Sequence, residues 1–123
     1  MPRKAVIVED DKVTLTMLSH ILETAGFAVV SAADGQTGLD LIFREIPDLV
    51  LADLLLPRLD GLGICAALRR DPRFGRTKIV IMTALKNFAL QGEARDSGAN
   101  AFLPKPFQSE ALYQMLKHLF PEA

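Results

Sequence analysis

Several features are scarce or missing in this chain of 123 residues. Its single cysteine, Cys65, cannot form an internal disulfide, which is typical of a protein kept in the reducing cytoplasm. No apolar run approaches the roughly 20 residues that cross a bilayer, and no secretory signal opens the sequence, so we expect no membrane association. The formal net charge is −1 and no Lys/Arg-rich run occurs, which gives no indication of nucleic-acid binding.

The composition is that of one globular domain. Half of the residues are apolar and 24% are charged. A chain of this length buries roughly two-thirds of its unfolded surface, which is enough for a real core. Because no repeat, low-complexity segment or linker divides the sequence, we predict a single domain over residues 1–123.

Short apolar segments alternate with longer segments of helical periodicity. The apolar segments, rich in Val, Ile, Leu and Ala, predict strands over residues 5–8, 27–32, 48–52, 78–82 and 101–104. They are mostly continuous, as in strands buried on both faces of a parallel sheet. Helical periodicity follows each of them, most weakly over residues 87–97. Five β–α units favour an α/β fold of the flavodoxin-like class, a doubly wound five-stranded parallel sheet with strand order 2-1-3-4-5 and helices on both faces.

Polar side chains follow four of the five predicted strands. They are Glu9, Asp10 and Asp11 after the first, Asp53 after the third, Thr83 after the fourth and Lys105 after the fifth. In open α/β sheets, ligands bind at the carboxyl ends of the strands, where the strand order reverses. With this order the reversal lies between strands 1 and 3, both of which end in acids. Converging carboxylates repel each other, and a hard cation such as Mg²⁺ relieves the repulsion, so the sequence predicts a magnesium site there.

The same residues favour phosphoryl chemistry. Asp53 can act as a nucleophile and form an acyl phosphate. The metal, the Lys105 amine and the Thr83 hydroxyl can then interact with the phosphoryl oxygens.

Four stretches, in this order and spacing, resemble the receiver domain of two-component response regulators. They are "VIVEDD", "PDLVLADLLLPRLDG", "IVIMTA" and "GANAFLPKPF". The resemblance covers about residues 4–120. It implies a signalling switch and not an enzyme: a histidine kinase or histidine phosphotransfer protein donates a phosphoryl group to Asp53 with Mg²⁺ (or Mn²⁺). It also implies a downstream protein partner on the face formed by the fourth helix, fifth strand and fifth helix.

The resemblance assigns a role to each site residue. Glu9 and Asp10 match the acidic pair that binds the metal, and Asp53 and the backbone carbonyl of Leu55 complete the protein ligands. Asp11 follows this pair and is a weaker candidate for a ligand.

Further roles come from the last two strands. Thr83 matches the switch hydroxyl, and Lys105 matches the lysine that contacts the phosphoryl group. Phe102 matches the switch aromatic, although the family often has Tyr there and Phe102 has no hydroxyl to bond. Pro106 matches a proline that follows the lysine through a cis peptide bond.

Two further expectations concern lifetime and helix capping. In the family, the positions two residues after the phospho-acceptor and after the switch hydroxyl tend to set the acyl-phosphate lifetime. Here they are Leu55 and Leu85, which cannot hydrogen-bond a water, so we predict slow hydrolysis. At the start of the last helix, Gln108 stands at the usual capping position and is a poor cap, so Ser109 is the expected alternative.

Other interpretations stay open from the sequence alone. A phosphohydrolase of the haloacid dehalogenase type also uses a nucleophilic Asp and Mg²⁺, but it needs a second Asp where this chain has Leu55. A pseudo-receiver that binds partners without phosphorylation usually lacks a site residue, and here all are present. Taken singly, Thr83 could cap a helix, Lys105 could be a surface charge and Phe102 could be a core ring.

Overall fold

A computed structural model describes residues 2–84, 92 and 96–121 of the chain. Within them, one sheet of parallel strands has the order β2-β1-β3-β4-β5. The strands are β1 (Arg3–Val8), β2 (Phe27–Ala32), β3 (Leu49–Asp53), β4 (Lys78–Thr83) and β5 (Ala101–Pro104). The helices are α1 (Lys12–Thr24), α2 (Gly35–Glu45), α3 (Gly61–Arg69) and α5 (Ser109–Leu119), with a short 3-10 helix η1 (Pro72–Phe74). The predicted fold class and strand order are confirmed.

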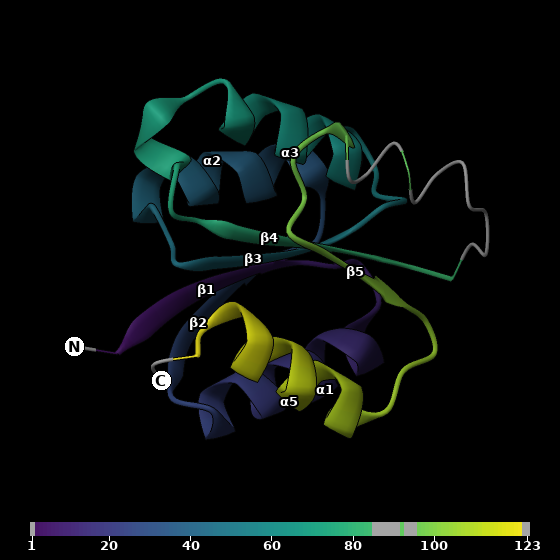
Figure 1. Ribbon diagram of the computed structural model, residues 1–123. Helices are drawn as coiled ribbons and strands as arrows, with labels where there is room; N and C mark the ends of the chain where they lie inside the picture. The colour runs from purple at the N-terminus through teal and green to yellow at the C-terminus, as the bar shows by residue number, and fades with distance from the viewer. Residues whose placement is uncertain (1, 85–91, 93–95, 122–123) are drawn as a thin grey trace.

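Helices cover both faces of the sheet. Figure 1 shows α2 and α3 on one face and α1 and α5 on the other. Along β1, Ala5 and Ile7 join the core beneath α1 and α5, whereas Val6 and Val8 join the core beneath α2 and α3. This double burial explains the continuous apolar strands, since each fully buried Val, Leu or Ile contributes about 1.5–3 kcal/mol.

Three of the described α-helices begin at an aspartate that caps them. Asp11, Asp34 and Asp60 accept hydrogen bonds from backbone N–H groups three residues further on, at 2.8–2.9 Å. These bonds satisfy donors that have no partner inside the helix.

The fifth helix begins differently, and the capping prediction for it was wrong. Gln108 occupies the cap position without a side-chain hydrogen bond, and Ser109 is already the first helical residue. The backbone N–H of Ala111 donates instead to the Gln108 carbonyl, at 3.0 Å. Glu110 adds an acid to the first turn, which the helix dipole favours.

Parts of the sequence-based expectations fall outside the described residues. The predicted helix over residues 87–97 does so almost entirely, and so does Leu85. In the part of the chain that the structure describes, no helix is long and apolar enough to cross a membrane.

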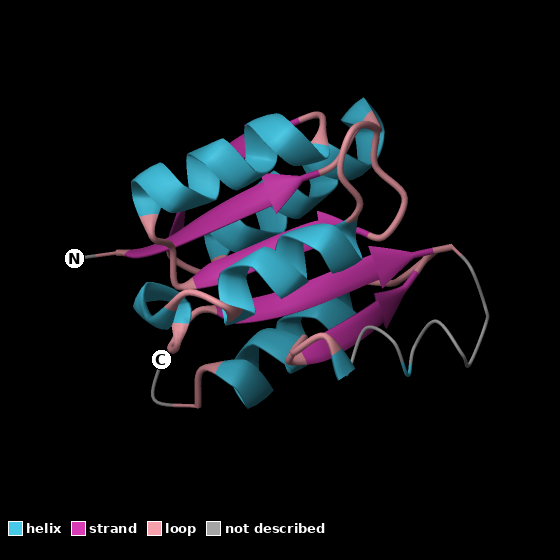
Figure 2. Ribbon diagram, turned by 90° about the horizontal axis from the view of Figure 1, so that it is seen from above, coloured by secondary structure: helices cyan, strands magenta, loops and turns pink. Residues whose placement is uncertain are grey.

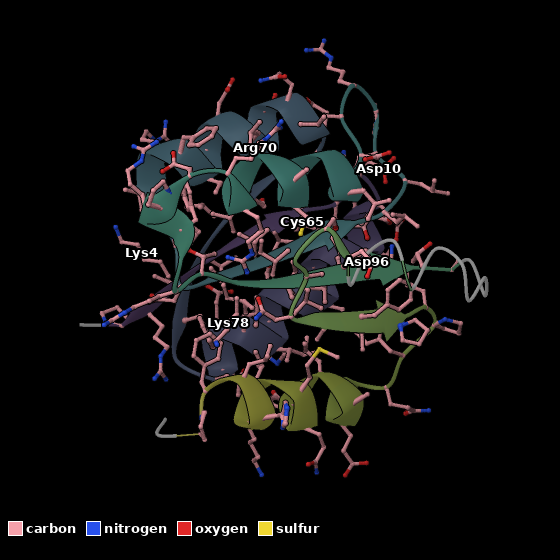
Figure 3. The ribbon with its side chains drawn as sticks, turned by 45° about the horizontal axis from the view of Figure 1, so that its top comes forward. Lys4, Asp10, Cys65, Arg70, Lys78 and Asp96 are labelled. Atoms are coloured by element: carbon pink, nitrogen blue, oxygen red, sulfur yellow. The ribbon has the colours of Figure 1, made fainter. Side chains whose placement is uncertain are left out.

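The strands bring their carboxyl ends to one edge of the sheet, because they all run in the same direction (Figure 2). Figure 3 shows Asp10 at this edge, and Lys4 and Lys78 at the opposite edge. An acid therefore lies at the carboxyl edge, and lysines lie at the amino edge.

Candidate functional site

Three carboxylates meet at the carboxyl edge of the sheet. Glu9 and Asp10 follow β1, and Asp53 ends the adjacent strand β3. One oxygen from each of the three lies within 4.8 Å of the others. Glu9 and Asp53 are buried, whereas Asp10 is exposed to solvent. The structure thus brings together the acids that the sequence placed at a metal site, and it opens the cluster to solvent on the Asp10 side.

Lys105 lies between two of these acids. Its ammonium group donates to Glu9 Oε1 and to Asp53 Oδ2, the latter at 2.6 Å. The other Asp53 oxygen, Oδ1, accepts the backbone N–H of Leu55 at 3.0 Å. Both oxygens of Asp53 are therefore held in place, one by a cation and one by a backbone dipole.

The burial of the cluster changes the protonation of its members. Burial raises the pKa of Glu9, and the hydrogen bonds from Lys105 and from the Asp11 N–H oppose this shift only in part. Burial by itself would lower the pKa of Lys105, but its bonds to Asp53 and Glu9 outweigh burial, so the pKa of this amine is raised. Lys105 therefore stays protonated and partly neutralises the acids.

The fourth and fifth strands position the remaining candidates. Thr83 ends β4 and is almost fully buried, and its backbone carbonyl accepts the N–H of Lys105 at 2.7 Å. Phe102 pairs with Ile81 across β4 and β5 and packs partly against the core beneath α2 and α3. The peptide bond between Lys105 and Pro106 is cis.

Asp11 does not belong to the carboxylate cluster. Its side chain caps α1, and hydrogen bonds from the Thr14 hydroxyl and N–H lower its pKa. The sequence carried a signal for this role that we did not use, since an Asp directly before a helical segment is a frequent N-cap. The run of three acids thus combines two site residues with one helix cap.

Leu55 contributes a backbone N–H to Asp53, as described, and its side chain is 60% exposed. The role of its carbonyl as a metal ligand stays a prediction. Sequence reasoning also missed the double ion pair of Lys105, because it joins residues 96 and 52 positions apart in the chain.

A parallel α/β sheet with an acid pair, a strand-end Asp and a lysine at its switch point defines a class of phosphate-handling site. Comparison with known proteins identifies the family within this class. The model of the response regulator receiver domain matches residues 5–117, so the chain belongs to that family. Receiver domains are the phosphoacceptor signalling switches of response regulators.

Individual relatives agree with this assignment. The chain is 38% identical over 119 residues to the DNA-binding dual master transcriptional regulator RpaA of Synechocystis, covering 97% of this chain and 49% of RpaA. The chain thus spans about half the length of the curated relatives it matches.

Solved structures show the same fold. The chemotaxis protein CheY4 of Vibrio cholerae superposes with a TM-score of 0.89 at 28% identity, over 97% of this chain and 99% of that one. The receiver domain of the sensor histidine kinase PA1611 of Pseudomonas aeruginosa superposes with a TM-score of 0.87 at 27% identity, over 99% of this chain and all of that one. The PA1611 structure has a magnesium ion coordinated in its active-site cleft.

Proposed function

We propose that this receiver domain, formed by residues 1–123, takes a phosphoryl group from a histidine kinase or a histidine phosphotransfer protein onto Asp53. The observation that carries the proposal is the position of Lys105, whose ammonium group bonds Asp53 Oδ2 at 2.6 Å beside the Glu9 and Asp10 carboxylates. A nucleophilic carboxylate, a fixed cation and an acid pair are the groups that phosphoryl transfer to a carboxylate needs. The cytoplasm stays the predicted compartment.

The donor set fits Mg²⁺ or Mn²⁺. Glu9, Asp10 and Asp53 supply oxygen ligands, and the Leu55 carbonyl would add a fourth. A cation bound there would neutralise negative charge on the phosphoryl oxygens. The exposed Asp10 leaves room for water ligands, which Mg²⁺ usually retains.

Transfer uses one oxygen of Asp53 as the nucleophile. A bond forms between this oxygen and phosphorus while the phosphorus–nitrogen bond of the donor histidine breaks, and its electron pair stays on the imidazole nitrogen. Lys105 exchanges its carboxylate contact for a phosphoryl oxygen, and the Thr83 hydroxyl donates to another. The Leu55 N–H holds the second Asp53 oxygen, which keeps the carboxylate oriented.

Phosphorylation biases an existing equilibrium between two conformations of the domain. The Thr83 hydroxyl moves toward the phosphoryl group, and the ring of Phe102 takes up the space that this movement leaves. We propose that a downstream protein binds the surface that β5 and α5 form around Phe102; the fourth helix, which the resemblance adds to this face, falls almost entirely outside the described residues. Thr83→Ala should accept the phosphoryl group and transmit the change less fully.

The phosphohydrolase alternative is less well supported. It requires an acid two residues after the nucleophile, and the leucine that stands there, Leu55, cannot transfer a proton to a leaving group.

A small-molecule phosphodonor with Mg²⁺ tests the proposal. Mass spectrometry should detect one phosphoryl group per chain in wild type and none in Asp53→Asn. Asp34→Asn is the matched control, since Asn caps α2 as well as Asp does and labelling should persist. Continuous release of phosphate would indicate a phosphohydrolase, and complete absence of label in wild type would indicate a pseudo-receiver.

A further inference from the structure

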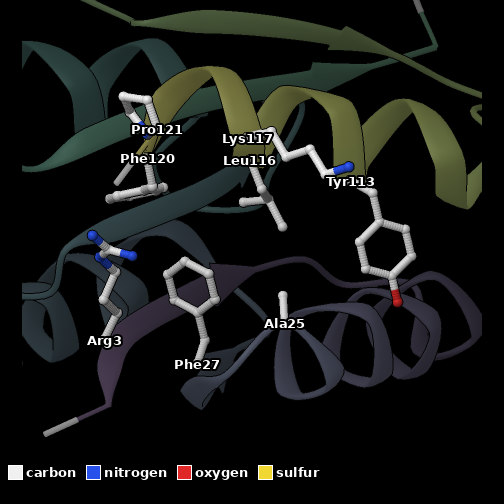
Figure 4. Close-up of a pocket in the computed structure, with 8 residues that line it drawn as sticks. All are labelled: Arg3, Ala25, Phe27, Tyr113, Leu116, Lys117, Phe120 and Pro121. Carbon is white, nitrogen blue, oxygen red and sulfur yellow. The ribbon is translucent and has the colours of Figure 1, made fainter. Parts of the chain in front are cut away.

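A pocket of about 260 Å³ lies at the edge of the sheet opposite to Asp53. Its walls come from the start of β1, the end of α1, the start of β2 and the end of α5 (Figure 4). The six residues of β1 span about 20 Å, and Arg3 at one end lines this pocket while Glu9 follows the other. The pocket is therefore separate from the phosphoacceptor site.

The pocket exists because small residues end the first helix. Ala25 lines the pocket and offers only a methyl group, and Gly26 follows it with a φ of +96°. A Cβ placed on Gly26 would meet no atom within 4 Å, so the space around this turn is open. Leu116 of α5 lies across from Ala25 and does not fill the gap (Figure 4).

The base of the pocket is aromatic. The rings of Phe27 and Phe120 meet edge to face, with centroids 5.5 Å apart and planes at 68°. Tyr113 points from α5 toward α1 and forms another wall (Figure 4). Such rings suit a flat apolar body, which finds both ring edges and ring faces to pack against.

The rim of the pocket is positively charged. Arg3 stands beside Phe27 in the strand register and holds its guanidinium 4.7 Å from the centre of the Phe120 ring. Lys117 is the second cation, and the residues that line the pocket within the described part of the chain include no acid. A guanidinium that stacks on a ring keeps its N–H groups at the edge, where they can donate to a carboxylate in pairs.

A second hollow continues the positive rim. It shares Arg3 and Phe120 with the pocket and adds Arg76 and Lys78, with Asp48 as its acid. Among the described residues, none of the cations Arg3, Arg76, Lys78 and Lys117 forms an ion pair. Asp48 is already engaged, because it accepts the backbone N–H of Lys4 at 2.8 Å. Two of these cations, Arg3 and Lys117, therefore line the aromatic pocket, the other two line the hollow beside it, and none has a carboxylate partner among the described residues.

We infer that this pocket binds a small aromatic carboxylate. The apolar body of one or two rings lies against Phe27, Phe120 and Leu116, and the carboxylate lies at Arg3, on the side of the second hollow. The inference rests on both the positive charge and the aromatic walls. A neutral ring would contact only the aromatic walls, and a small anion would contact only the cations. The site acts independently of Asp53.

Titration of the 123-residue chain with 2-naphthoate tests the inference by amide NMR. We expect saturable shifts at the amides of Ala25, Phe27, Leu116 and Phe120, with a dissociation constant on the order of 1 mM or tighter. A neutral naphthalene alcohol should bind about tenfold more weakly, and acetate should cause no shift at these amides. Asp53→Asn should bind 2-naphthoate as wild type does. The binding inference and the phosphorylation proposal can therefore fail independently of each other.

Three variants make the test specific. Arg3→Gln should weaken binding about tenfold, because it removes the paired donors. Ala25→Phe should abolish binding by filling the pocket from an exposed position at the helix end, without changing the charge. Lys4→Gln is the matched control, since Lys4 neighbours Arg3 but does not line the pocket, and binding should be unchanged.

Three results would overturn the inference. The first is an absence of amide shifts at 2-naphthoate concentrations up to 10-fold above the expected dissociation constant. The second is equal affinity of wild type, Arg3→Gln and Ala25→Phe for 2-naphthoate. The third is concentration-dependent association of the chain that shifts the same amides without ligand, which would assign this face to a second copy of the protein.

Discussion

Two polar clusters lie at opposite edges of the same sheet, and they are built in opposite ways. At the carboxyl edge, the carboxylates of Glu9, Asp10 and Asp53 lie together, and one ammonium group, that of Lys105, bonds Glu9 and Asp53. Negative charge is left in excess, and one acid faces solvent. A further positive group, such as the proposed Mg²⁺, would balance this charge.

At the amino edge, a single arginine donates to neutral acceptors through all three of its nitrogens. Arg69 donates through Nε to the Gly98 carbonyl at 3.0 Å and through Nη1 to the Phe74 carbonyl at 2.7 Å. Its Nη2 donates to the Thr77 carbonyl and to Asn100 Oδ1, both at 2.8 Å. Thr77 and Asn100 directly precede β4 and β5, so Arg69 ties α3 to the starts of two strands.

The comparison distinguishes a polar cluster that stabilises the fold from a polar cluster that can bind a ligand. A cluster that holds the fold pairs its donors with acceptors fixed by the backbone, and it leaves nothing for a ligand. A cluster that binds a charged ligand concentrates like charges, and their repulsion lowers the stability of the fold when the ligand is not bound. Substitutions at the two edges should therefore affect different measurements.

The largest effect on folding is expected for Arg69→Met. Loss of the guanidinium leaves several partly buried carbonyls without donors, so the free energy of unfolding should fall by about 2–4 kcal/mol in urea titrations. Affinity for Mg²⁺ should not change. Arg70→Met is the control, because Arg70 is exposed, and it should stay within about 0.5 kcal/mol of wild type. A parallel loss of Mg²⁺ affinity in Arg69→Met would contradict the separation of the two edges.

Asp10→Asn should have the opposite profile. Removal of a charged ligand should weaken Mg²⁺ binding by about tenfold or more, measured by calorimetry. Stability without metal should be unchanged or higher by about 0.5–1 kcal/mol, because repulsion within the cluster is relieved. Asp11→Asn is the neighbouring control: its side chain caps α1, Asn caps equally well, and affinity should change less than about threefold. Equal losses in both variants would refute the assignment of Asp10.

Lys105→Gln should tighten Mg²⁺ binding about fivefold, because the ammonium group competes with the metal for Glu9 and Asp53. The same change should lower stability without metal, since the buried Glu9 then lacks its cation. Lys12→Gln, which removes an exposed lysine, should leave both quantities near wild type. Weaker Mg²⁺ binding in Lys105→Gln would show that the lysine organises the site instead of competing for it.

The pH dependence of the metal site should report on Glu9. Because burial raises the pKa of Glu9, protons should compete with Mg²⁺ at a higher pH than at an ordinary glutamate. Without metal, the folded state binds the Glu9 proton more tightly than the unfolded state does. The free energy of unfolding should therefore rise as pH falls through the raised pKa of Glu9. Glu9→Gln should remove both dependences, and their persistence would assign them to another group.

The smallest effect is expected for Leu55→Asn. The exposed Leu55 side chain cannot hold an attacking water, so wild-type acyl phosphate should decay slowly. Asn supplies a hydrogen bond to that water and should speed decay about two- to fivefold, well below the gain from a positioned proton acceptor. The decay of labelled protein measures this, with Val13→Asn as a control at another exposed apolar position. Decay of the wild type within seconds would contradict the prediction.

The sequence by itself was enough to determine the fold and the place where Glu9, Asp10 and Asp53 come together. Continuous apolar runs separated by helical periodicity indicated buried parallel strands, and the structure has each of them within two residues of the predicted ends. The acids at the ends of the first and third strands indicated where these strands meet. Both signals are local, since burial on two faces and a strand's end are written into neighbouring residues.

The tertiary structure alone decided how the polar groups are shared. It turned Asp11 to cap α1 while Glu9 and Asp10 joined Asp53, placed Lys105 between two acids, and collected the partners of Arg69 from η1 and two strand starts. It also left the aromatic pocket at the amino edge open. These outcomes depend on distances between side chains far apart in sequence, and hydrogen bonds and ion pairs form only where the packed backbone brings their atoms within about 3 Å.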